Sequence, residues 1–169
     1  MIFFKLEIVV LSLKHLTKFF YNDMINSSKK YTCAIARSTK LIGDKWSLLI
    51  MRDAILHKKS RFKEFKSSKE KIATNILTVR LDFLVKEGFL EKITPLGTKK
   101  STRYIALDKG LSSLNIIIEM YLFSIYSIDE SILDNTQIAI KSAIISSPQI
   151  FKEKKIEEYL KFAKELRAL

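Results

Sequence analysis

The segment of residues 72–90 constrains the fold of this chain more than any other part of it. Leu77, Leu81 and Leu84 recur with the i, i+4, i+7 spacing that places side chains on one face of an α-helix. Gly88 follows, and glycine is suited to the left-handed conformation in which many helices end. The pattern predicts an amphipathic helix that stops just before this glycine, with its leucines packed against a core.

The other face of this helix, expected at about residues 73–87, carries small side chains near its N-terminus. At 100° per residue, Asn75 and Val79 lie opposite the leucines, Thr78 lies on a flank and Thr74 lies at the N-terminal tip. In a helix docked in the major groove, residues at this end reach base edges. Asparagine pairs there with adenine, and small apolar groups contact the thymine methyl. The alternative is an ordinary surface helix in which these side chains serve solubility.

The net charge of +12 is concentrated in the middle of the chain. Residues 31–124 contain 18 Lys and Arg against 9 Asp and Glu, whereas residues 125–169 contain 7 of each. A polyanionic partner would explain this excess, because each neutralised phosphate releases condensed counterions. A solvated basic surface would explain it equally well, and charge alone does not distinguish the two.

The composition excludes several classes of protein. A single cysteine, Cys33, rules out an internal disulfide framework and a cysteine-rich zinc site. His15 and His57 are too far apart in sequence for a metal-ligand motif, so neither a metal nor another cofactor is expected. We find no nucleophile–base pair, carboxylate pair or phosphate-binding loop, and therefore do not expect an enzyme. With 4 Gly and 2 Pro, an all-β fold is disfavoured.

The periodicity predicts a mainly α protein with one small β-hairpin. Asp44 is expected to cap a helix over 45–56, and Trp46 is expected to lie in the core. After Gly88 the pattern changes to that of two strands, as expected for a winged helix-turn-helix with additional N- and C-terminal helices. The further expected elements are helices at 31–43, 63–69, 109–126, 130–146 and 150–168, a strand or turn at 58–62, strands at 89–94 and 102–107, and a wing at 95–103.

Three parts of the chain are expected. Residues 31–125 form the DNA-binding domain, and residues 126–169 form a helical extension for dimerisation or packing. Residues 1–30 form an N-terminal extension, expected to contain a packing or dimerisation helix; it is too charged to span a membrane. Alternatively, Met24 is the native start and the residues before it are translated upstream sequence.

Basic side chains accompany the predicted recognition helix and wing. Lys99, Lys100 and Arg103 in the wing are candidates for clamping phosphates or entering the minor groove. Arg61 precedes the supporting helix and could anchor the DNA backbone in the same way. Arg80 lies nearer the core side of its helix, where it binds phosphate or supports the fold. For all of them the alternative is an ordinary solvated charge.

Several segments resemble those of the HxlR-type winged-helix regulators, relatives of the MarR group. The matching pieces are Cys33, Ala36-Arg37, Leu41 to Asp53 with its Gly43-Asp44-Lys45-Trp46 core, Arg61 to Phe65, Leu77-Thr78-Val79-Arg80-Leu81, Leu84, Glu87 to Leu90, Arg103-Tyr104 and Asp108-Lys109-Gly110. The resemblance covers about residues 31–125. Lys63 departs from it, because the family usually has a Ser or Asn helix cap at this position.

The resemblance implies a cytoplasmic transcription regulator that binds a palindromic double-stranded operator as a homodimer. Some members sense oxidants or electrophiles through a cysteine at the position of Cys33, which makes this residue a candidate redox sensor and an oxidant or small molecule a candidate effector. The alternative for Cys33 is a small buried hydrophobic residue. The alternative for the whole chain is a winged helix that binds proteins without specific DNA binding.

Overall fold

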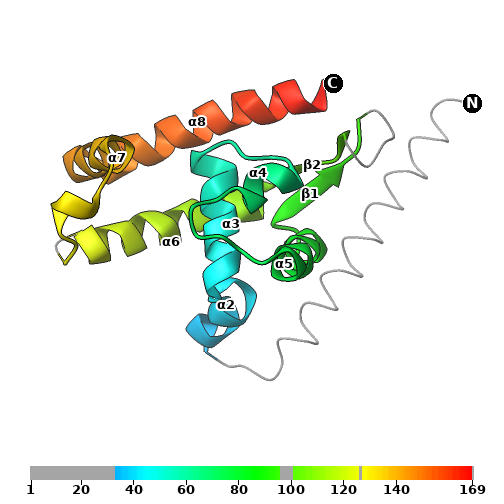
Figure 1. Ribbon diagram of the computed structural model, residues 1–169, viewed down its shortest axis with the longest axis horizontal. Coiled ribbons are helices and arrows are strands. Elements are labelled where there is room, and N and C mark those ends of the chain that lie inside the picture. Colours follow the sequence, from blue (N-terminus) through cyan, green and yellow to red (C-terminus); the bar gives the residue numbers. More distant parts are fainter. Residues whose placement is uncertain (1–32, 96–100, 126, 169) are drawn as a thin grey trace, which may run out of the picture. The chain divides into compact units, whose positions relative to one another are not determined.

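The computed structural model of the chain describes residues 33–95, 101–125 and 127–168 (Figure 1). It divides into two compact units, residues 1–43 and residues 44–169. In the first unit the described residues form one helix, α2 (Ala34–Ile42), with Cys33 at its N-cap position. All other elements belong to the second unit, so α7 and α8 of the C-terminal extension lie in the same unit as the winged helix.

The second unit has the element order of a winged helix-turn-helix followed by further helices, which confirms the expected fold class. Its described elements are α3 (Lys45–Leu56), α4 (Phe62–Lys66), α5 (Thr74–Lys86), β1 (Leu90–Ile93), β2 (Arg103–Ala106), α6 (Asp108–Ile125), a 3₁₀ turn (Glu130–Ile132), α7 (Asn135–Ser146) and α8 (Pro148–Arg167). None of the helices within the described ranges is long and apolar enough to cross a membrane.

The cap of α3 is the one expected from the sequence. The Asp44 carboxylate accepts hydrogen bonds from the backbone N–H groups of Trp46 and Ser47, both at 3.1 Å. These donors have no partner within the helix, so the cap stabilises its first turn. Trp46 itself is only partly buried, because it lines a pocket that opens to solvent. The expectation of a core tryptophan is therefore met in part.

The predicted recognition helix α5 packs through its leucine ridge and ends at the glycine. Leu77, Leu81 and Leu84 are completely buried. Gly88 has φ +72°, and its N–H donates to Val85 O while the next N–H, of Phe89, donates to Leu84 O. This pair of bonds satisfies the last carbonyls of the helix in the Schellman arrangement. A side chain at Gly88 would meet no neighbour, so glycine is required there by the backbone conformation and not by space.

The wing strands β1 and β2 pair antiparallel, with Leu90 opposite Ala106 and Ile93 opposite Arg103. A strand or turn is expected at residues 58–62, and the structure has no strand there. One hydrogen bond of a strand pair nevertheless forms, from Tyr104 N–H to Ser60 O at 2.8 Å. The connection between α3 and α4 thus lies along the outer edge of β2.

The C-terminal extension packs onto the winged helix through α8, which contacts α3, α6 and β2 (Figure 1). Phe151, Tyr159, Ala163 and Leu166 are its buried residues. The single helix expected at residues 130–146 is divided, because Asp134 caps α7 by accepting from Gln137 N–H at 3.0 Å. The other helices and strands begin and end within a few residues of the expected positions.

Candidate nucleic-acid interface

The N-terminal half of α5 presents an exposed face of small side chains. The residues named for base contact, Thr74, Asn75, Thr78 and Val79, are all exposed, and Val79 retains 61% of its accessible surface. The Asn75 amide has no hydrogen-bond partner among the described residues. The Thr78 hydroxyl donates to Thr74 O at 3.0 Å, so it is engaged with its own helix. The Asn75 amide and the Thr74 hydroxyl are therefore the polar side-chain groups of this face that are free to bind an external group.

Arg80 lies on the flank of α5 and contacts the N-terminal end of α3. Its Nε is 3.2 Å from the Asp44 carboxylate, which also caps α3, and its guanidinium lies over the Phe83 ring. Of the two roles weighed for this arginine, the geometry supports the structural one, because the ion pair ties α5 to the start of α3. A phosphate would have to compete with Asp44 for the same guanidinium.

Arg61 is exposed at the N-cap position of α4. Glu64 caps this helix in place of a serine or asparagine, since its carboxylate accepts from Ser60 N–H at 2.7 Å and Arg61 N–H at 2.9 Å. Burial raises the pKa of Glu64, but these backbone bonds and the nearby charges of Arg61 and Arg103 outweigh burial and lower it. The Arg61 side chain thus reaches solvent from a helix end that is already capped.

The wing residues divide into two groups. Lys99 and Lys100 lie outside the described residues. Arg103 is 6% exposed, and its Nη1 donates to Ser101 O at 2.9 Å and to Thr102 O at 3.3 Å. In this conformation the guanidinium stabilises the start of β2 and does not reach solvent for a phosphate. All four residues of β2 are buried, so the strand does not alternate between buried and exposed positions. Sequence periodicity therefore could not indicate that Arg103 is buried.

Sequence reasoning missed a buried carboxylate that holds the helix-turn-helix together. Asp53 on α3 is 2% exposed and accepts from Lys59 Nζ at 2.7 Å and Arg52 Nη2 at 2.6 Å. Ser68, in the segment between α4 and α5, contacts the same carboxylate. Arg52 also pairs with Glu70 of that segment, at 2.7 Å. The cluster joins α3 to the residues that lead directly into α5.

A carboxylate on an apolar helix was the available signal, because Asp53 stands among Ile50, Ala54 and Ile55, all buried. Burial raises the pKa of Asp53, but hydrogen bonds from Lys59, Ser68 and Arg52 outweigh burial and leave that pKa below its ordinary value. The group therefore remains ionised throughout the neutral range and holds its cationic partners.

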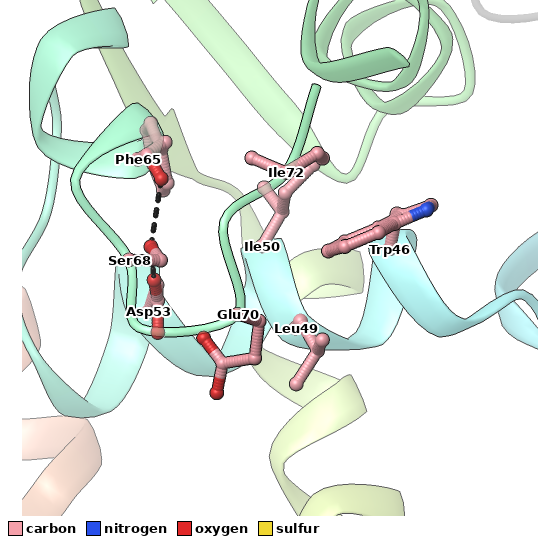
Figure 2. Close-up of a pocket in the computed structure, with 8 residues that line it drawn as sticks. All are labelled: Trp46, Leu49, Ile50, Asp53, Phe65, Ser68, Glu70 and Ile72. Carbon is pink, nitrogen blue, oxygen red and sulfur yellow. Dashed lines mark hydrogen bonds between the residues drawn. The ribbon is translucent and has the colours of Figure 1, made fainter. Parts of the chain in front are cut away.

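The pocket beside this cluster is lined by α3 and by the segment leading into α5 (Figure 2). Its lining residues are Trp46, Leu49, Ile50, Asp53, Phe65, Ser68, Glu70 and Ile72. Its empty volume is about 230 Å³ including space open to solvent. Pockets that enclose a small ligand are larger, roughly 300–1,000 Å³. The pocket is therefore no candidate for an effector site.

Cys33 is exposed, which does not fit the alternative of a buried hydrophobic residue. Its thiol makes no hydrogen bond that caps α2. Within the described ranges, no group of three or more His, Cys, Asp or Glu side chains is arranged to hold a metal ion.

Replacing the buried carboxylate tests its contribution to stability. We expect Asp53→Asn to lower the free energy of unfolding by about 2–3 kcal/mol, since Lys59 and Arg52 lose a charged acceptor. Because the folded-state pKa is depressed, the stabilisation is present above about pH 4, the ordinary pKa of Asp, and is lost as pH falls through the lower folded value. Urea unfolding from pH 7 to pH 2 measures both effects.

Asp82→Asn, on the exposed face of α5, is the matched control and should change the unfolding free energy by less than about 0.5 kcal/mol. Glu64 and Glu70 also have lowered pKa values. The unfolding free energy of the Asp53 variant should therefore still fall as pH is lowered, but less steeply than that of the wild-type protein. Equal stability of both variants would contradict the role of Asp53.

Residues 41–131 match the family model described as HxlR-like helix-turn-helix. No curated protein matches the chain. Among solved structures, the proposed transcription factor PA1607 is 31% identical, with 64% of this chain and 75% of that chain covered and a TM-score of 0.55.

A second structure, of the proposed transcription factor PA1374 from Pseudomonas aeruginosa, is 39% identical over 54% of this chain and 61% of that chain, with a TM-score of 0.40. The family match covers more than half of the chain and includes α3, α5, both wing strands and α6. The chain therefore belongs to the HxlR-like helix-turn-helix family, a class of DNA-binding transcription factors and not of enzymes.

Proposed function

We propose that the protein is a sequence-specific regulator that binds a palindromic operator as a homodimer in the cytoplasm. In this proposal α5 enters the major groove with Thr74, Asn75, Thr78 and Val79 toward the bases, and the wing lies on the backbone or in the minor groove. The observation that carries it is the free, exposed Asn75 amide at the N-terminal end of a helix whose opposite face is buried.

Phosphate contacts in this proposal come from Arg61 and from Lys99 and Lys100 of the wing. Arg80 and Arg103 support the interface indirectly, because their guanidinium groups are engaged with Asp44 and with backbone carbonyls. The alternative, a winged helix that binds only proteins, would leave the basic surface without a role in DNA binding. A salt titration with operator DNA separates the two.

The dimer is proposed to use the exposed apolar stripe of α6. Ile116, Met120 and Phe123 follow the i, i+4, i+7 spacing and are 40%, 52% and 89% exposed. A contiguous exposed apolar patch of this kind marks an interaction site. An isologous contact through it would bring two copies of α5 to one palindrome. Residues 1–30, which lie outside the described residues, and residues 126–169 are proposed as packing or dimerisation extensions.

Asn75→Ala tests the proposed base contact. We expect the dissociation constant for the operator to rise about 10-fold at fixed salt, since a bidentate amide–adenine contact is worth about 1–3 kcal/mol. Asn115→Ala, which removes an exposed asparagine of α6, is the matched control and should leave affinity unchanged. Fluorescence anisotropy with the promoter palindrome of the chain's own gene is the measurement. Absence of salt-dependent binding, even at low salt, would leave only the protein-interaction alternative.

Phe123→Asp tests the proposed dimer surface. A carboxylate at the most exposed position of the α6 stripe should shift the protein from dimer to monomer in sedimentation velocity, because it places a charge in an apolar contact. Leu160→Asp, on α8, is the control and should remain dimeric. If only the α8 variant dissociates, the dimer uses the terminal helix and not the stripe of α6.

Cys33→Ser tests a thiol response. The exposed position of Cys33 favours access by an oxidant, and we propose that its oxidation weakens operator binding. We expect hydrogen peroxide to lower the operator affinity of the wild-type protein and not that of the variant. The same response in both proteins would contradict a role for the cysteine and leave a non-covalent effector as the remaining proposal.

A further inference from the structure

The outer edge of β2 needs hydrogen-bond acceptors that a two-stranded hairpin cannot supply. Alternate backbone groups along a strand point to opposite edges, so the N–H groups of Tyr104 and Ala106 face away from β1. Tyr104 N–H donates to Ser60 O at 2.8 Å. Ala106 N–H donates to the phenol oxygen of Tyr159 at 2.6 Å. The first acceptor belongs to the helix-turn-helix, whereas the second belongs to the C-terminal helix α8.

Tyr159 is well placed to fix the position of the strand. The whole residue is buried, and its phenol reaches from the middle of α8 to the last residue of β2. Buried backbone N–H groups are nearly always paired, and an unpaired one is costly. No other acceptor for this N–H exists among the described residues.

Two ion pairs place α8 against the same region. Glu158, next to the tyrosine, lies 3.7 Å from Lys58 in the connection that leads to Ser60. Arg167, near the end of the helix, lies 3.0 Å from Glu91 of β1. These exposed pairs contribute little energy by themselves. They show, however, that α8 contacts the α3–α4 connection and β1, in addition to β2.

We propose that Tyr159 is a positioning residue for the wing, and that α8 completes the edge of β2 by supplying the acceptor that a third strand would otherwise provide. The family match ends at residue 131, before α8 begins. Wing contacts with DNA would then depend on a helix outside the matched segment. The proposal rests on the proposed DNA binding only for this last step.

The test compares Tyr159→Phe with Tyr121→Phe. Tyr121 is a matched control because its hydroxyl also bonds a backbone group, donating to Gln137 O at 3.0 Å, but does not contact the wing. In native-state hydrogen exchange of the free protein, we expect the Ala106 amide to exchange about 10-fold faster or more in the Tyr159 variant and at the wild-type rate in the Tyr121 variant.

In operator binding, a plot of log K against log salt concentration should have a slope that is shallower by roughly 1–2 for Tyr159→Phe than for the wild-type protein. Each phosphate that the wing no longer binds accounts for about one unit of this slope. General destabilisation of a protein that remains folded would not change this slope. Unchanged exchange at Ala106 would overturn the proposal, and faster exchange with an unchanged slope would overturn its link to DNA. If the wild-type protein bound no DNA, the proposed function would fail while the exchange experiment still decided the role of Tyr159.

A measurement on the wild-type protein covers the case in which Tyr159→Phe does not fold. In mild denaturant, the Ala106 amide should become exchangeable together with the amides of α8, because unfolding of that helix removes its acceptor. Opening of Ala106 while α8 remains protected would overturn the proposal without any substitution.

Discussion

The placement of α5 depends on one buried carboxylate. Hydrogen bonds from Lys59, Arg52 and Ser68 replace those that the Asp53 carboxylate would make to water. Arg52 and Lys59 precede α4 in the sequence, and Ser68 follows it. An ionised group at 2% exposure is tolerated only when it is fully paired, so the chain between α3 and α5 must adopt the one path that supplies those partners. The leucine ridge of α5 provides burial, but apolar contacts are not directional. The charged cluster adds directional contacts between α3 and the residues that lead into α5.

A second constraint comes from the edge of the hairpin. In a two-stranded hairpin the outer edge of each strand has no neighbouring strand to bond its backbone groups. At the outer edge of β2, the acceptors are the backbone carbonyl of Ser60 and the phenol oxygen of Tyr159. Gly110 adds a steric requirement, because a Cβ there would lie 2.2 Å from Phe89 O. Helix α6 therefore approaches the start of β1 at a distance that only glycine permits. The hairpin is thus held by close contacts from α6, which follows it directly, and from two elements that are distant in sequence, the α3–α4 connection and α8.

Local sequence patterns were sufficient to predict most helices and strands and the ends of α5. Asp44 and Gly88 act through neighbours within a few residues, so the sequence predicted them correctly. The ridge of Leu77, Leu81 and Leu84 packs against more distant elements, but its helical spacing is local and was also predicted correctly. The Asp53 cluster and the Tyr159 contact were not predictable in this way. Except for Arg52, which adjoins Asp53, the partners are 6 to 53 residues away. Arg103 shows the same limit: its residue type suggested phosphate binding, while its burial is decided by the packing of β2.

The fate of the arginines and lysines refines what the net charge of +12 means for DNA binding. Arg52, Lys59 and Arg80 are paired with acidic groups of the helix-turn-helix, and Arg103 is bonded to backbone carbonyls. Counterion release on binding counts only the charges that reach a phosphate, so the electrostatic footprint is smaller than the sequence total suggests. In the described part of the α3–α5 region, the exposed Arg61, Lys63, Lys71 and Lys86 form no ion pair with an acidic side chain and remain available. In the proposed complex, specificity would then come from the bases that α5 is proposed to contact, because phosphate contacts supply affinity without selecting a sequence.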